Sequence, residues 1–139
     1  MFTGADYFVV AQHLENEAQN SPSSDAMYRA AISRYYYSCY LTARSKLYKE
    51  GQWSNKTLTS HTAVWTTIKQ KEQTVGDWYF QLKMLREHAD YHLWQPPHLA
   101  GSNPINHCQC HSWKNSASDT ARFAHDLASW IIDFFNTLP

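Results

Sequence analysis

The chain has 139 residues, 43% of them hydrophobic and 17% charged, a composition typical of a globular protein rather than a disordered one. Its 12 Lys and Arg residues balance 12 Asp and Glu residues, so the formal net charge is zero. A neutral chain is not expected to coat duplex nucleic acid, which requires a surplus of cations, but it can hold a few phosphates.

The length of the chain favours a single compact domain over residues 1–139. The three cysteines are an odd number and do not indicate a disulfide framework. No basic segment followed by an apolar run opens the chain, so we expect no secretory signal. The most apolar tract, residues 130–135, is interrupted by Asp133 and is too short to span a bilayer. We therefore expect a cytoplasmic protein without membrane contact.

Apolar residues recur at spacings of three and four along several stretches. The low content of glycine (4) and proline (5) also favours helices over a fold with many tight turns. We predict helices over about residues 6–18, 25–50, from 60 onward, 76–95, and from 113 or 116 to 138. The expected fold is all-α, an antiparallel bundle of four or five helices.

Two apolar stripes are expected to form most of the core. The stripe on the second predicted helix comprises Tyr28, Ala31, Ile32, Tyr35, Tyr36, Cys39, Ala43 and Leu47. The stripe on the last predicted helix comprises Ala121, Ala124, Leu127, Ala128, Ile131 and Phe135. The six tryptophans are spread along the chain, so we expect most of them in the core rather than in a base-stacking platform.

The segment 82–94 (L-K-M-L-R-E-H-A-D-Y-H-L-W) is the strongest candidate for a functional site. It carries Arg86, His88, Asp90 and His92 near the end of a predicted helix. Histidine titrates near neutral pH and can move protons, and arginine holds phosphate through paired donors without titrating. A simpler interpretation stays open, in which Arg86 and Asp90 form a helical ion pair and His92 is a cation at the helix C-terminus.

Arg86 and His92 converge only if the helix ends irregularly. On an ideal helix the two lie about 120° apart around the axis and about 9 Å apart along it. Pro96 and Pro97 disfavour helical geometry before them, so the helix should fail by about Gln95. We expect its last residues to turn His92 back toward Arg86.

Residues 31–38 (A-I-S-R-Y-Y-Y-S) and 85–91 (L-R-E-H-A-D-Y) together resemble the HEPN superfamily. In its bacterial single-domain subgroup the pattern runs A-I-S-R-x-Y-Y, then a helix opening near a histidine, then L-R-x-x-A-D-Y. The matching residues are Ser33, Arg34, Tyr36, Tyr37, His61, Arg86, Ala89, Asp90 and Tyr91. The resemblance covers about residues 25–93 and depends on two separated segments in the right order.

The resemblance implies a helical bundle that usually forms homodimers. Many HEPN members are metal-independent endoribonucleases with an R-x(4–6)-H motif, which Arg86 and His92 match with five intervening residues. It implies His92 as general acid/base and Arg86 as phosphate clamp, supported by the side chains of Ser33, Arg34, His88 and Asp90. The expected protein is an RNA-cleaving toxin or defence component that needs no cofactor, with an antitoxin as a possible partner.

A second implication of the resemblance is a non-catalytic module. Some HEPN proteins work beside a small nucleotidyltransferase, so this chain is alternatively a helical module that binds a protein partner or a nucleotide. Glu87 follows Arg86 where active members commonly carry Asn, Asp or His. A carboxylate at that position repels a phosphate unless it points away. Tyr36 and Tyr37, in the other matching segment, are alternatively aromatics of the core or of the dimer interface.

The run His107-Cys108-Gln109-Cys110-His111, with His98 upstream, has the composition of a metal site. Its C-x-C spacing is tighter than the C-x(2–4)-C usual in structural zinc sites, and no second ligand pair occurs elsewhere in the chain. We therefore expect loop and helix-cap residues here, and no metal.

Overall fold

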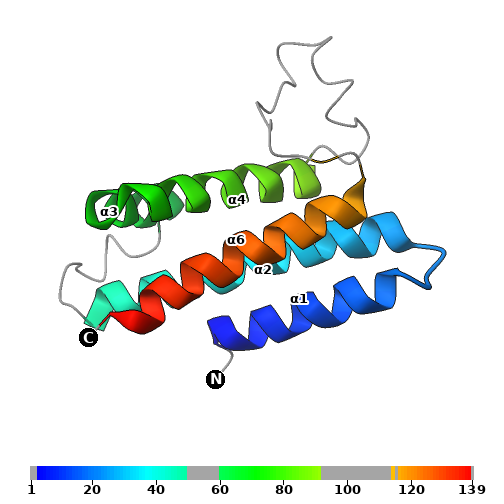
Figure 1. Ribbon diagram of the computed structural model, residues 1–139, viewed down its shortest axis with the longest axis horizontal. Coiled ribbons are helices and arrows are strands. Elements are labelled where there is room, and N and C mark those ends of the chain that lie inside the picture. The colour runs from blue at the N-terminus through cyan, green and yellow to red at the C-terminus, as the bar shows by residue number, and fades with distance from the viewer. Residues whose placement is uncertain (1–2, 50–59, 92–113, 115, 139) are drawn as a thin grey trace, which may run out of the picture.

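The computed structural model describes residues 3–49, 60–91, 114 and 116–138. These residues form five helices and no strand, which confirms the all-α prediction. The helices are α1 (Gly4–Ala18), α2 (Ser24–Lys49), α3 (His61–Lys71), α4 (Gln73–Tyr91) and α6 (Ala117–Thr137). Figure 1 shows α1 and α2, α2 and α4, and α4 and α6 running antiparallel to one another.

Three of the helices begin at a side chain that caps free backbone N–H groups. Thr3 and Asp6 form a capping box on α1, in which the Thr3 hydroxyl accepts from the Asp6 amide and the Asp6 carboxylate accepts from the Thr3 amide. Ser60 and Ser116 accept from the amides of Ala63 and Asp119 and cap α3 and α6 in the same way. These caps place the helix starts close to the predicted positions.

Helix α2 lies at the centre of the bundle and packs against α1, α4 and α6. Every residue of the two predicted apolar stripes, on α2 and α6, is buried, with at most 8% of its surface exposed. Of the three described tryptophans, Trp65 and Trp78 are half-buried and pack against the core, whereas Trp130 is 45% exposed and departs from the expectation. A polar indole edge favours such a boundary position, and the Trp65 ring N–H donates to the Gly76 carbonyl.

A buried carboxylate joins α1, α2 and α6. Glu15 on α1 accepts a hydrogen bond of 2.6 Å from the Tyr35 hydroxyl on α2. It also accepts two hydrogen bonds of 3.1 Å from the Arg122 guanidinium on α6. Burial and the neighbouring carboxylate raise the pKa of Tyr35, so its hydroxyl stays protonated and donates. The three side chains fix the relative positions of three helices inside the bundle.

Helices α3 and α4 form a tight hairpin with Glu72 alone between them. Gly76, in the first turn of α4, allows this approach because a Cβ there would lie 2.7 Å from the Lys69 Cα atom of α3. No larger residue fits without shifting one helix. His61, the first residue of α3, lies against Tyr36 and Tyr40 of α2.

No helix in the described ranges is both long and apolar enough to cross a membrane.

Candidate functional site

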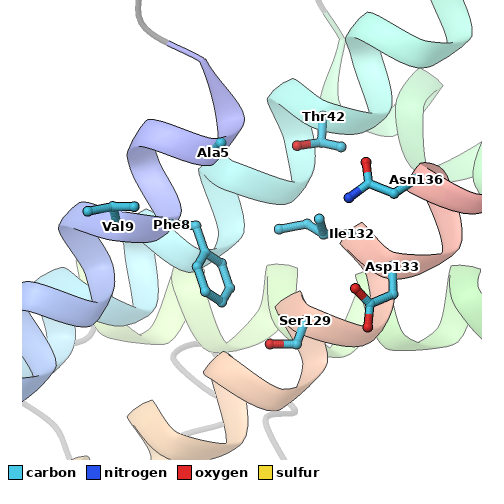
Figure 2. A pocket seen from close by; sticks show the side chains of 8 residues that line it. All are labelled: Ala5, Phe8, Val9, Thr42, Ser129, Ile132, Asp133 and Asn136. Carbon is cyan, nitrogen blue, oxygen red and sulfur yellow. The ribbon is translucent and has the colours of Figure 1, made fainter.

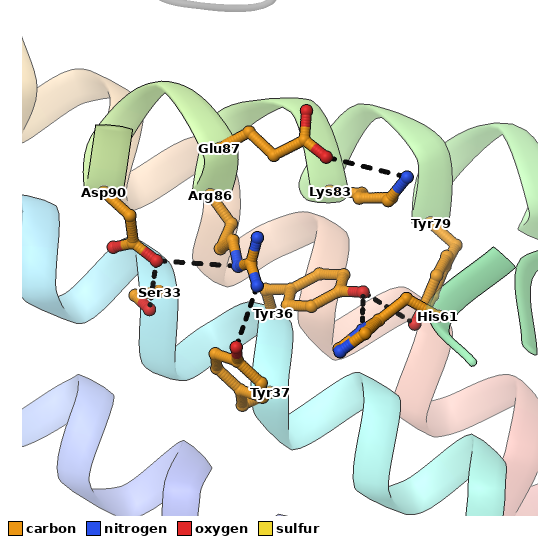
Figure 3. Close-up of polar contacts among 9 residues, drawn as sticks. All are labelled: Ser33, Tyr36, Tyr37, His61, Tyr79, Lys83, Arg86, Glu87 and Asp90. Carbon is orange, nitrogen blue, oxygen red and sulfur yellow. Dashed lines mark hydrogen bonds and ion pairs between the residues drawn. The ribbon is translucent and has the colours of Figure 1, made fainter. Parts of the chain in front are cut away.

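Arg86 projects from α4 toward α2 and is held there by two polar contacts (Figure 3). Its Nη2 donates to the Tyr37 hydroxyl at 2.8 Å. Its Nε lies 3.5 Å from Asp90 Oδ2, the separation of an ion pair rather than of a well-aligned hydrogen bond. The side chain is 11% exposed, so most of the guanidinium is shielded from water. The predicted Arg86–Asp90 ion pair is therefore present in the structure.

Aromatic rings enclose the same guanidinium. The Cζ atom of Arg86 lies 5.2 Å from the ring centre of Tyr36, 5.3 Å from that of Tyr37 and 5.4 Å from that of Tyr91. These distances are within the range of cation–π attraction. Burial alone would lower the pKa of Arg86, but the Tyr37 hydrogen bond and the electrostatic interactions with Tyr37, Tyr91 and Tyr36 together outweigh it and leave the pKa raised. The site thus holds a permanent, oriented positive charge.

Asp90 is fixed from the α2 side. The Ser33 hydroxyl donates to Asp90 Oδ2 at 3.2 Å, and the same oxygen faces Arg86. Burial raises the pKa of Asp90, and the Ser33 hydrogen bond and the charges of Arg86 and Arg34 only partly offset that effect. Asp90 therefore positions Arg86 while remaining partly shielded from solvent.

His61 completes the group of polar residues on this face. Its Nδ1 lies 2.6 Å from the Tyr36 hydroxyl, which also accepts a 3.2 Å hydrogen bond from the Tyr79 hydroxyl. The imidazole stacks on Tyr40 with 4.2 Å between ring centres. Burial lowers the pKa of His61, and the nearby positive charges lower it further. His61 is therefore neutral at physiological pH.

Glu87 points away from Arg86. Its carboxylate lies 3.6 Å from the Lys83 ammonium on the outer side of α4, whereas Arg86 faces α2 (Figure 3). The carboxylate that follows the arginine in sequence is therefore paired elsewhere. This placement meets the condition under which Glu87 does not repel a phosphate bound near Arg86.

The structure brings together three of the residues predicted for the site, Ser33, Arg86 and Asp90. Arg34 is exposed, with its guanidinium 5.7 Å from the Tyr7 ring centre, and its charge still reaches Asp90. His88 lies in the interior with 0% of its surface exposed, so it is not on this face. His92 lies outside the described residues.

His61 was not among the predicted site residues. The only signal in the sequence was its match to the histidine of the HEPN pattern, at the opening of the third helix. Its contacts with Tyr36 and Tyr40 depend on the packing of α3 against α2, which helical periodicity does not reveal.

Cys39, the one remaining candidate that lies among the described residues, does not join this site. Cys39 is fully buried, and burial raises the pKa of its thiol, so it is not an activated nucleophile. The run His107 to His111 and His98 lie outside the described residues. Within the described parts of the chain, no three or more His, Cys, Asp or Glu side chains are arranged to hold a metal ion.

A pocket of about 380 Å³ lies between α1, α2 and α6 (Figure 2). Phe8, Val9 and Ile132 give it an apolar lining, and Thr42 and Asp133 are among its polar residues. None of the predicted site residues that the structure describes lines this pocket. It is separate from the group of residues around Arg86.

No family model, curated protein or solved structure matches the chain. The HEPN resemblance therefore rests on the two sequence segments alone.

Proposed function

We propose that the chain is a HEPN-type, metal-independent endoribonuclease that acts as a homodimer. The observation that carries the proposal is the oriented guanidinium of Arg86, held by Tyr37 and Asp90 on a face that also presents His61. A fixed cation of this kind suits a phosphodiester, because two parallel donors match two phosphate oxygens. Glu87 is directed away from it, which removes the main electrostatic obstacle.

The proposed reaction is an internal transfer that needs no metal. His92 takes the proton of a ribose 2′-hydroxyl, and the 2′-oxygen attacks phosphorus as the bond to the 5′-oxygen breaks. The leaving 5′-oxygen takes a proton from His92 of the partner subunit. The products are a 2′,3′-cyclic phosphate and a 5′-hydroxyl. Arg86 stabilises the additional negative charge that develops on the phosphorane.

This mechanism makes the homodimer part of the site, because each chain supplies one His92. In the proposed biological role, a toxin or defence nuclease, an antitoxin would keep the activity in check. Sedimentation analysis should therefore show a dimer under the conditions in which RNA is cleaved. A strictly monomeric active species would contradict the shared site.

The test is to incubate the purified protein with structured RNA in the presence of EDTA. We expect cleavage that ends in 2′,3′-cyclic phosphates, and a loss of roughly a hundredfold or more in Arg86→Ala and His92→Ala. Arg86→Lys keeps the charge but loses the planar donors and should recover only part of the activity. His13→Ala, an exposed histidine on α1, is the matched control and should cleave normally. Unchanged activity in both site variants would refute the proposal.

One observation favours the alternative, a non-catalytic HEPN module that binds a nucleotide or a protein partner such as a nucleotidyltransferase. The Arg86 guanidinium already has Tyr37 and Asp90 as partners and is only 11% exposed. In that case the wild type should bind a nucleotide or its partner protein and should cleave no RNA.

A further inference from the structure

The two hydrogen bonds that link Tyr79 to Tyr36 and Tyr36 to His61 determine which nitrogen of His61 carries a proton. Tyr36 and Tyr79 are both 0% exposed, so water does not satisfy their hydroxyl groups. Three groups in a row make two hydrogen bonds, of 3.2 Å between the hydroxyls and 2.6 Å to Nδ1. If Nδ1 carried a hydrogen, three hydrogens would compete for these two bonds, and one buried donor would lose its acceptor.

A buried donor without an acceptor incurs the full desolvation penalty, whereas the other tautomer satisfies every group. In that tautomer Tyr79 donates to Tyr36, Tyr36 donates to Nδ1, and the imidazole carries its hydrogen on Nε2. Stacking on Tyr40 at 4.2 Å holds the ring in this orientation. The tyrosines therefore fix both the tautomer and the direction of the Nε2–H group.

This Nε2–H group is available to a ligand. Nε2 of His61 has no hydrogen-bond partner among the described residues, and it is not one of their buried unpaired atoms. Arg86 and His61 both lie against the Tyr36 ring, at 5.2 Å from Cζ to the ring centre and 5.6 Å between ring centres. Figure 3 shows Tyr36 extending from the Arg86 guanidinium to His61.

We infer that His61 is a second phosphate-binding residue of the site, whose Nε2–H donates to one oxygen of the phosphodiester held by Arg86. The inference rests on the proposed function for the identity of its ligand, an RNA phosphodiester. A neutral donor here adds a directed hydrogen bond without bringing a second charge close to Arg86. It also means that His61 is not the general base, because Nδ1 accepts from Tyr36 and Nε2 already bears its hydrogen.

The tautomer is measured directly by NMR of the ¹⁵N-labelled wild-type protein at neutral pH. We expect His61 Nε2 to show the shift of a protonated ring nitrogen and Nδ1 that of an unprotonated one. A short 2′-O-methyl RNA oligonucleotide, which lacks the attacking hydroxyl and is not cleaved, should then shift the His61 signals on binding. An unprotonated Nε2 in the free protein would overturn the inference, and this measurement needs no variant.

Two substitutions separate the two ring nitrogens. His61→Asn keeps a polar group near the position of Nδ1 but removes the donor at Nε2, and it should weaken oligonucleotide binding roughly tenfold to a hundredfold. His61→Gln places an amide N–H near the position of Nε2 and should retain more of the affinity. Equal affinity in His61→Asn and wild type, or no binding by the wild type, would overturn the inference.

The outcomes for the inference and for the proposed function are distinct. Binding that depends on His61, without cleavage of unmodified RNA, would support the phosphate site and refute the nuclease. Cleavage that is lost in Arg86→Ala but unchanged in His61→Asn would support the nuclease and refute the role of His61.

Discussion

Replacing Glu15 by alanine tests the buried link among α1, α2 and α6. The substitution removes the acceptor of the Tyr35 hydroxyl, which is 0% exposed and donates at 2.6 Å. A buried hydroxyl without a partner costs about 1–3 kcal/mol. The Arg122 side chain is 57% exposed, so loss of its ion pair adds only about 0–1 kcal/mol. The two contributions add to about 1–4 kcal/mol, and we expect Glu15→Ala to lower the free energy of unfolding by about 2–3 kcal/mol, the middle of that range.

The measurements are urea unfolding and thermal unfolding, both followed by circular dichroism, with Glu17→Ala as the matched control because Glu17 is exposed on the same helix. The melting temperature of Glu15→Ala should fall by roughly 6–12 °C in a chain of this size. Tyr35→Phe removes the donor instead of the acceptor, so the double variant should lose less stability than the two single variants added together. A Glu15→Ala variant as stable as Glu17→Ala, or an additive double variant, would show that the link does not stabilise the bundle.

Three further predictions concern other parts of the molecule. Gly76→Ala should destabilise the protein by about 1–3 kcal/mol in urea titrations, despite the better helix propensity of alanine, because the new Cβ meets the Lys69 backbone. The lowered pKa of His61 means that the unfolded chain binds a proton that the folded chain releases. The wild type should therefore lose stability relative to His61→Gln as the pH falls below about 6.5, and parallel pH profiles would contradict this. With the other two cysteines replaced by serine, Cys39 should resist a thiol-specific reagent until the protein unfolds, because it is fully buried and its pKa is raised.

Much of the bundle follows from periodicity in the sequence. The stripes on α2 and α6 are buried as predicted because residues three and four apart share a helix face. The same rule gave the Arg86–Asp90 pair, whose members are four residues apart. Local spacing was sufficient in these cases because each interaction lies within one helix.

Helical periodicity also excludes His88 from the site, although the prediction included it. His88 follows Arg86 by two residues, which places it about 200° around the helix from Arg86. Because Arg86 projects toward α2, His88 is directed away from the site, and its side chain is fully buried. Residue type alone grouped the two, and helical geometry separates them.

The contacts that could not be predicted from the sequence join residues that are far apart in the chain. Tyr36 and His61 are separated by 25 positions, and Glu15 and Arg122 by 107. Each pair depends on how two helices dock, which is decided by packing over whole helix faces. The neutral His61 beside Arg86 is therefore a property of the assembled bundle.

Tyr35, Tyr36 and Tyr37 are consecutive on α2, and successive residues of a helix point about 100° apart. Tyr35 reaches Glu15 on α1, Tyr36 reaches His61 on α3, and Tyr37 reaches Arg86 on α4. One residue inserted ahead of them in α2 would rotate all three together and break every one of these contacts at once. Evolution or engineering of a new specificity on this scaffold would therefore have to change the surrounding positions and preserve this single helical turn.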